Sequence, residues 1–332
     1  MKEKKRVDYL DIVGGFFIIV MILSHVEARC WQSSFKLKVL LDVFNFFMPW
    51  FFYKSGYFYR KRTVHELLVN GVKKLLVPFF VFFILSIPLF YIELGIRSDT
   101  NWMHYVFSPF KALLLQQALD TNSPLWFLVT LFGVQLAYIF LEYHLGKHKQ
   151  VKMFVILVLV ILLAYSLCKL EIDKPYILAN FCSGLFFYGL GRSLNRHEIQ
   201  MTKNQVAACV FVYAMIYMLY PSILSMYMNK LECGNYFVWI ISSIVGILAI
   251  NGLVRYFCNN MLLSYIGKHS MGYYVLHYPI IVAISFIIHD GLKLSDTIMY
   301  ICMLFALVIF LPFAENILQK SKFKWILGYG KK

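Results

Sequence analysis

Residues 10–28 read LDIVGGFFIIVMILSHVEA, and this stretch decides the fold class of the chain. It is apolar except for Asp11, Ser24, His25 and Glu27. About 20 mostly apolar residues, rising about 1.5 Å each in a helix, cross the hydrocarbon core of a bilayer. No small-residue cleavage site follows the stretch, so we expect it to be a retained first membrane helix and not a signal peptide.

Similar apolar stretches fill the rest of the chain. Pro49 interrupts the second stretch, and Pro78 and Pro88 lie in the third; membrane helices tolerate such breaks where neighbours satisfy the freed backbone groups. We therefore predict an all-α, polytopic integral membrane bundle of about ten transmembrane helices, forming one domain over residues 1–332. The ten predicted spans are 10–28, 37–59, 75–95, 124–143, 151–170, 176–191, 206–226, 236–254, 272–289 and 297–316.

The composition supports a chain that lies in a lipid bilayer. It is 60% hydrophobic and only 15% charged, whereas about a quarter of a soluble domain is charged. The aromatic content of 18% suits interfacial belts of Trp and Tyr. The net charge of +15 sits in short runs between apolar stretches, which is typical of orientation signals. We therefore expect the bilayer, and no nucleic acid, as a partner.

The distribution of basic residues predicts the orientation of the bundle. With ten spans, 22 of the 32 Lys and Arg residues fall on one side and nine on the other, while Lys54 lies within a span. Loops on the cytoplasmic side of a membrane carry an excess of Lys and Arg. We therefore expect both termini of the chain in the cytoplasm.

Two ionisable residues of the first span share one helix face. Asp11 and His25 are 14 residues apart, which places them within about 40° of each other and about 21 Å apart along the axis. Gly14 and Gly15 lie on the same stripe and would let another backbone or a ligand approach closely. A histidine has an ordinary pKa near 6.5 and can act as a general base, so His25 is a candidate catalytic residue. The alternative is an interfacial histidine that caps the helix end.

Further polar residues lie in or beside the later spans. Lys54 is near the inner end of the second span, where it either snorkels to the interface or has a function. Lys73 and Lys74 open the third span, where they either hold phosphate groups or follow the charge rule. His277 lies inside the ninth span, as a structural or a functional histidine, and Ser270 is the predicted N-cap of that helix.

Metal and disulfide signals are weak. His144 and His148 have metal-compatible spacing but lie in a basic loop without a carboxylate, so we expect no metal. Cys30 and Cys233 both fall in loops that we place outside, which leaves a disulfide between them open.

Several motifs in a fixed order resemble one known family. These are RVDYLDIVGG at 6–15 followed by His25, FMPWFFYKSGY at 47–57, KLLVP at 74–78, PLWFL at 124–128, FYGLG at 187–191 and YIGKHSMGYYVLHYP at 265–279. In this order and at this spacing, over nearly the whole chain, they resemble the membrane-bound acyltransferase family 3, which contains many bacterial sugar O-acetyltransferases.

The resemblance implies an O-acetyltransferase of the bacterial plasma (inner) membrane. Such an enzyme moves an acyl group, usually acetyl from cytoplasmic acetyl-CoA, to a carbohydrate hydroxyl of a surface polysaccharide or a lipid-linked glycan. Together with the polar residues described above, the resemblance makes His25 and Asp11 the catalytic candidates. The substrate-binding candidates are Lys54, Lys73, Lys74, Trp126, Ser270 and His277. The alternatives are a glycan or lipid transporter or flippase, and an inactive relative.

One position departs from the family pattern. The family usually has Arg, or sometimes Lys, where this chain has Gly14, and that basic residue is thought to help handle the acyl donor. Lys54, Lys73 or Lys74 are the candidates to supply the missing charge. If one of them does, Gly14→Arg should leave activity unchanged or improve it.

Overall fold

The computed structural model describes residues 8–30, 37–96, 105–115, 118–146, 149–170, 177–196, 201–225, 228 and 235–328. Helices dominate these ranges, and none of the residues in them forms a strand. The predicted all-α fold class is therefore confirmed for this part of the chain.

Within the described ranges, seven helical segments are long and apolar enough to cross a membrane by length and composition. The count of ten is not confirmed, because three predicted spans do not qualify: the second, which is broken into two short helices, and the sixth and seventh. α10 (Ile177–Arg196) carries several polar residues, and α11 (Lys203–Leu219) has only 17 residues. The seven segments are Asp8–Arg29, Val64–Gly95, Ser108–His144, Gln150–Lys169, Tyr236–Phe257, Ser270–Gly291 and Asp296–Lys320.

The second predicted span is broken at a different place from the one predicted. α2 (Lys38–Asp42) ends at a turn over residues 43–46, and α3 (Phe47–Tyr57) begins after it. Pro49 does not interrupt a helix, because it lies in the first turn of α3, where a backbone N–H would have no partner within the helix. The predicted break at Pro49 is therefore wrong.

The third predicted span begins earlier than expected. α4 (Val64–Gly71) starts at a capping box, in which Thr63 and Glu66 exchange side chain-to-backbone hydrogen bonds of 3.1 and 3.0 Å. A π-helical segment, η1 (Val72–Leu76), joins it to α5 (Val77–Ile96). Short π-segments are often found at functional sites, and this one carries Lys73 and Lys74.

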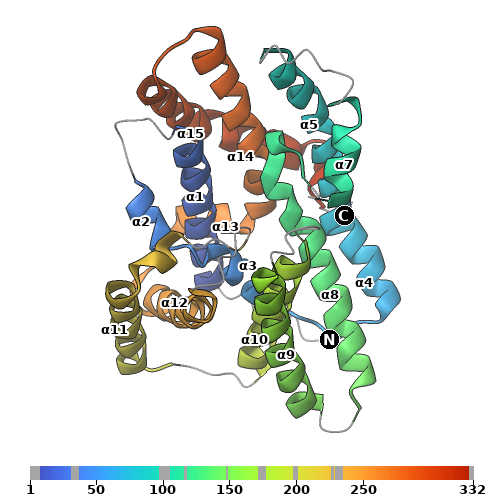
Figure 1. Cartoon of the computed structure of the whole chain (residues 1–332), viewed down its shortest axis with the longest axis vertical. Coiled ribbons are helices and arrows are strands. Elements are labelled where there is room, and N and C mark those ends of the chain that lie inside the picture. The colour runs from blue at the N-terminus through green and yellow to red at the C-terminus, as the bar shows by residue number, and fades with distance from the viewer. Residues whose placement is uncertain are drawn as a thin grey trace.

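α1 (Asp8–Arg29) lies in the middle of the bundle and packs against α13 (Met261–Lys268) and α14 (Ser270–Ser285) (Figure 1). The backbones of α1 and α13 touch through glycines. A Cβ atom at Gly15 would lie 2.0 Å from the carbonyl oxygen of Leu263, and one at Gly267 would lie 1.8 Å from that of Asp11. The close approach expected from the glycines of the first span is therefore confirmed for Gly15.

α3 and α10 form a second close contact. A Cβ atom at Gly56 would lie 1.9 Å from the carbonyl oxygen of Tyr188, and one at Gly191 would lie 2.0 Å from that of Tyr53. The remaining helices surround these two pairs, with α9 beside α10, α11 beside α12 and α14 beside α15 (Figure 1). The remaining bounds are α7 (Ser108–Leu115), η2 (Asp120–Leu125), α8 (Trp126–His144), α9 (Lys149–Lys169), η3 (Pro221–Ser225), α12 (Tyr236–Phe257), η5 (Phe286–Gly291), α15 (Asp296–Lys320) and η6 (Lys324–Leu327).

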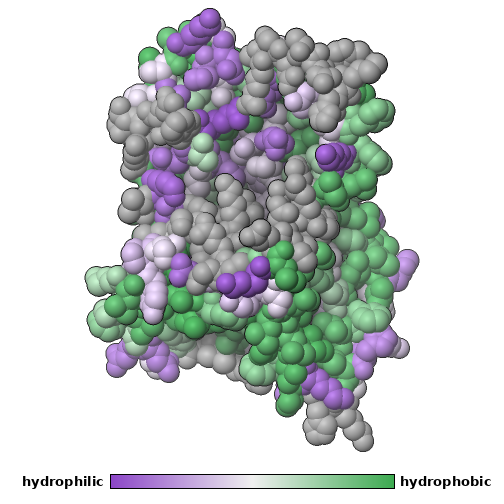
Figure 2. Space-filling view, viewed as in Figure 1, coloured by the Kyte–Doolittle hydropathy of each residue, from purple (hydrophilic) through white to green (hydrophobic). Residues whose placement is uncertain are grey.

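The outer surface of the bundle is apolar where α8 and α9 lie. Figure 2 shows this surface over the lower right of the molecule. On α9 the exposed side chains include Phe154, Leu159 and Leu163. A helix that exposes this much apolar surface is stable against lipid tails and not against water.

The cysteines do not pair as one sequence interpretation allowed. Cys30 is a buried free thiol, and its sulfur lies 3.7 Å from that of Met303. A disulfide between Cys30 and Cys233 is therefore wrong. Cys168, near the end of α9, is the disulfide-bonded cysteine of the described residues, and Cys233 itself lies outside them.

Candidate active site

A cavity of about 460 Å³ lies beside the C-terminal half of α1. We call it the histidine pocket, because His25 is part of its wall. α1, α2, α3, α8 and α14 contribute to it, together with the segments that lead into α3 and α8. Its polar and aromatic lining residues are Ser24, His25, Glu27, Lys38, Asp42, Asn45, Phe47, Ser123, Trp126 and Tyr274.

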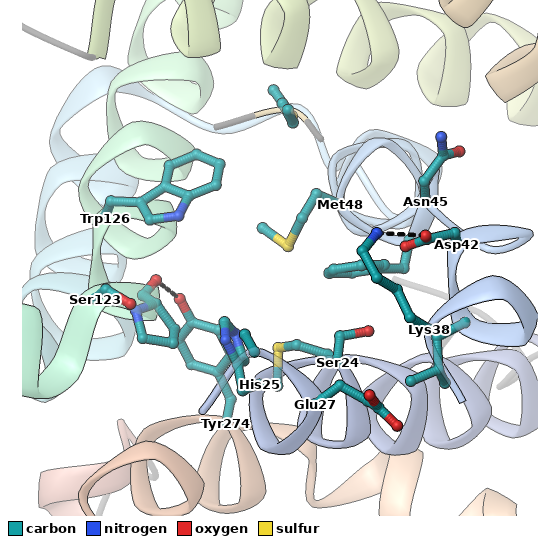
Figure 3. Close-up of a pocket in the computed structure, with 16 residues that line it drawn as sticks. Ser24, His25, Glu27, Lys38, Asp42, Asn45, Met48, Ser123, Trp126 and Tyr274 are labelled. Atoms are coloured by element: carbon teal, nitrogen blue, oxygen red, sulfur yellow. Dashed lines mark hydrogen bonds and ion pairs between the residues drawn. The ribbon is translucent and has the colours of Figure 1, made fainter. Parts of the chain in front are cut away.

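Figure 3 shows how these side chains face the cavity. His25, Ser24 and Glu27 project from α1 on one side, Trp126 lies on the opposite side, and Met48 reaches between them. His25 thus faces a cavity of the bundle.

Hydrogen bonds fix the walls of the histidine pocket. The Tyr274 hydroxyl donates to the carbonyl oxygen of Pro124, which ties α14 to the turn in front of α8. Lys38 pairs with Asp42 at 2.5 Å one helical turn along α2. Ser24 donates to the carbonyl oxygen of Val20 in its own helix at 2.8 Å. None of these three interactions uses the His25 ring, which lines the same cavity.

A second histidine lies against His25. The ring centroids of His25 and His277 are 5.3 Å apart. The rings of His25 and Tyr278 pack edge to face, with their centroids 5.0 Å apart. His277 is fully buried and lines neither the histidine pocket nor the basic pocket described below. The structure thus places His277 behind His25, and not in contact with a substrate in the cavity.

The hydrogen bonds of His277 assign its tautomer. Its Nδ1 lies 2.7 Å from the carbonyl oxygen of Tyr274 and 3.2 Å from that of Tyr273. A carbonyl oxygen only accepts, so Nδ1 carries the hydrogen and Nε2 keeps its lone pair. Nε2 is buried and has no hydrogen-bond partner among the residues that the structure describes. The Nε2 lone pair of His277 can therefore accept a hydrogen bond that none of the described residues supplies.

A second cavity, of about 400 Å³, is lined by four basic residues. We call it the basic pocket. The four are Lys54 of α3, Arg60 and Arg62 just after it, and Lys74 of the π-helical segment. Clustered cations of this kind suit phosphate groups.

Some of the remaining candidate residues from the sequence line one of these cavities, and others do not. Ser270 lines the basic pocket, but it is the first residue of α14 and not its N-cap, since His269 holds that place without a side-chain cap bond. Lys73 is exposed and is not part of the lining of the basic pocket. Trp126 lines the histidine pocket. His148, considered with His144 for a metal, lies outside the described residues.

Asp11 is placed with Lys54 and not with His25. The carboxylate oxygen of Asp11 lies 3.5 Å from the ammonium nitrogen of Lys54, and Asp11 is buried. The 14 residues between Asp11 and His25 correspond to about 21 Å along α1. Asp11 therefore belongs to the environment of the basic pocket, and its predicted catalytic role has no contact with His25 to support it.

The Phe127 ring, which itself lines the basic pocket, packs against aromatic residues of both cavity linings. The ring centroid of Phe127 is 6.1 Å from that of Phe51, which lines the basic pocket, and 5.9 Å from that of Tyr274, which lines the histidine pocket. Trp126, beside Phe127 in sequence, is 6.2 Å away. The Phe127 ring thus lies between aromatic residues of the two linings. Sequence interpretation missed Phe127, Arg60 and Arg62, although all three lie in or directly after the quoted motifs.

The helical bundle thus has two cavities, one lined by His25 and one lined by four basic residues, which is the architecture of a polytopic membrane protein with an internal site. The family model described as an acyltransferase domain, that of acyltransferase family 3, matches residues 7–315. The chain therefore belongs to the membrane-bound acyltransferase family 3, and it is a membrane acyltransferase. No curated protein and no solved structure matches this chain.

Proposed function

We propose that this acyltransferase moves an acetyl group from acetyl-CoA to a hydroxyl of a surface polysaccharide or a lipid-linked glycan at the bacterial inner membrane. The observation that carries the proposal is the placement of His25. It lines one cavity, and Phe127, whose ring is 5.9 Å from that of Tyr274 in the same lining, lines the neighbouring pocket together with four cations. A base, an acceptor cavity and an anion-binding cavity are the parts that acyl transfer from a coenzyme needs.

The basic pocket suits the acyl donor. Coenzyme A carries several phosphate charges, and Arg60, Arg62, Lys54 and Lys74 supply compensating charge in one cavity. Arg60, Arg62 and Lys74 belong to the side of the bundle with the excess of Lys and Arg, which favours the cytoplasmic face and cytoplasmic termini. The donor would enter from the compartment in which acetyl-CoA is made.

The histidine pocket suits a carbohydrate acceptor. Trp126 offers a broad apolar face, while Asp42, Asn45 and Glu27 offer hydrogen-bond acceptors around the same cavity. A ligand site of this kind combines apolar surface with a few polar groups that fix orientation. A volume of about 460 Å³ also has room for a sugar unit beside His25.

The chemistry requires one base and exclusion of water. His25 takes the proton of the acceptor hydroxyl, and the oxygen attacks the thioester carbonyl. The carbon–sulfur bond then breaks, and the leaving thiolate takes the proton from the imidazolium. General base catalysis contributes about 10²–10⁴-fold, and holding the two substrates together contributes more. A closed bundle interior suppresses hydrolysis of the thioester.

We predict that Phe127→Ala raises the hydrolysis of acetyl-CoA several-fold when no acceptor is present. Removing the ring joins the two pockets and lets water reach the thioester. The measurement is the release of free thiol by purified protein in detergent. The control is Phe52→Ala, because the Phe52 ring is 4.9 Å from Phe127 but lines neither pocket. Equal hydrolysis in both variants would show that Phe127 is not the barrier.

A transfer assay with radiolabelled acetyl-CoA tests the proposed function. Proteoliposomes with a glycan acceptor should form a carbohydrate-bound label that mild base releases as acetate. A transporter or flippase would move glycan without transferring label, and an inactive relative would bind coenzyme A and transfer nothing. Either of these results would overturn the proposal.

A further inference from the structure

The ammonium group of Lys54 occupies the space that a side chain at position 14 would fill. A Cβ atom built on Gly14 would lie 2.8 Å from Lys54 Nζ, 3.4 Å from the Trp50 ring and 3.7 Å from Gly267 Cα. Lys54 comes from α3 and Gly14 from α1, so the two positions are adjacent in space through packing alone. This niche between α1, α3 and α13 has room for one cation.

The position of Lys54 is not that of a snorkelling lysine. A snorkelling side chain extends towards water or lipid headgroups. Lys54 turns instead towards α1, where its ammonium lies 3.5 Å from the buried Asp11 carboxylate and 5.4 Å from the centre of the Trp50 ring. Its side chain is 17% exposed, and the residue lines the basic pocket. The charge is therefore held inside the bundle and presented to a cavity.

Lys54 is also the cation of the basic pocket that contacts the helix carrying His25. Gly14 and His25 are 11 residues apart, or roughly 16 Å along α1. An extended pantetheine arm of coenzyme A is of comparable length. A thioester beside His25 would therefore leave the phosphate at the other end of the arm near Lys54. The other three cations suit the more distant phosphates. Arg60 and Arg62 follow α3, and Lys74 lies on the π-helical segment η1.

We propose that Lys54 binds the donor phosphate nearest the pantetheine arm, and that position 14 is glycine because the Lys54 ammonium fills its side-chain space. A cation that contacts the first helix is thus supplied from α3. This inference rests on the proposed function, since it names the residue that binds the donor in the same site.

The test is the affinity for coenzyme A, which does not depend on catalysis. Lys54→Met keeps the length of the side chain and removes the charge. We expect its Kd for coenzyme A to rise about 10- to 100-fold, the range for loss of a hydrogen bond to a charged group. Lys54→Arg should stay within a few-fold of the parent protein. The control is Lys152→Met, an exposed lysine on α9 that lines neither pocket.

The decisive variant relocates the charge. Gly14→Arg alone should retain coenzyme A binding, because the Lys54 ammonium is the flexible end of its side chain and can move aside. Gly14→Arg combined with Lys54→Met should recover most of the affinity that Lys54→Met loses. Unchanged affinity in Lys54→Met would overturn the inference, as would a folded double variant that binds no better than Lys54→Met.

Failure of this inference and failure of the proposed function give different results. If Lys54 has no role in binding, Lys54→Met binds coenzyme A normally and the parent protein still transfers label. If the proposed function is wrong, the parent protein transfers no label whatever the affinity of the variants. Thermal stability without ligand separates loss of binding from loss of fold in each variant.

Discussion

Replacing His25 by alanine is expected to lower acyl transfer by about 10²–10⁴-fold, the contribution of a positioned general base. The protein should remain folded and should still bind coenzyme A, because His25 lines the histidine pocket and lies about 16 Å along α1 from the niche of Lys54. The measurements are label transfer to the acceptor, the Kd for coenzyme A and the thermal stability of the purified protein.

The matched control is His144→Ala, which removes an exposed histidine at the end of α8 that lines neither cavity. It should transfer label at the rate of the parent protein. Full activity of His25→Ala would show that the base lies elsewhere, and the geometry of the histidine pocket would then lose its functional meaning.

Gly267→Ala should cause the largest loss of stability, about 3 kcal/mol, at the upper end of the range for overpacking. An added methyl group would lie 1.8 Å from the carbonyl oxygen of Asp11 and 2.8 Å from the backbone nitrogen of Gly15. Both are backbone atoms of α1, so α1 and α13 would have to move apart. The measurement is the temperature at which the detergent-solubilised protein loses its monodisperse state.

Gly133→Ala is the matched control for this effect. Its added methyl group would meet the Phe181 ring at 3.4 Å, which is close to an ordinary contact. We expect its stability to differ little from that of the parent protein. If Gly267→Ala proved as stable as Gly133→Ala, the two helices would not be held as close together as the structure places them.

The long apolar helices were predictable because hydrophobic length is a local property of the sequence. α13 was not, since its eight residues are too few to span a membrane and it is fixed by contact with α1. The break between α2 and α3 was also missed. Residues 43–46 contain no proline or glycine, whereas Pro49 gave a breaker signal from inside the first turn of α3.

The candidate site was predictable only in part. Helical periodicity placed Asp11 and His25 on one face of α1, but periodicity gives an angle and not a contact, and the two lie beside different cavities. The pairing of His25 with His277 joins residues 252 positions apart, and that of Gly14 with Lys54 joins separate helices. Such contacts depend on the packing of the whole bundle, which the residue pattern of a single sequence does not predict.

The position of Phe127 between the linings of the two pockets has a consequence for where the acyl carrier stays in the cell. Under the proposed function, the nucleotide of the donor stays in the basic pocket while its pantetheine arm and acyl group reach past the ring to His25. The carrier then remains in the compartment where it is recharged, and only the acyl group, as small as two carbons, is transferred. Modification of a glycan across the membrane then needs no export of the carrier and no second activated donor on the far side.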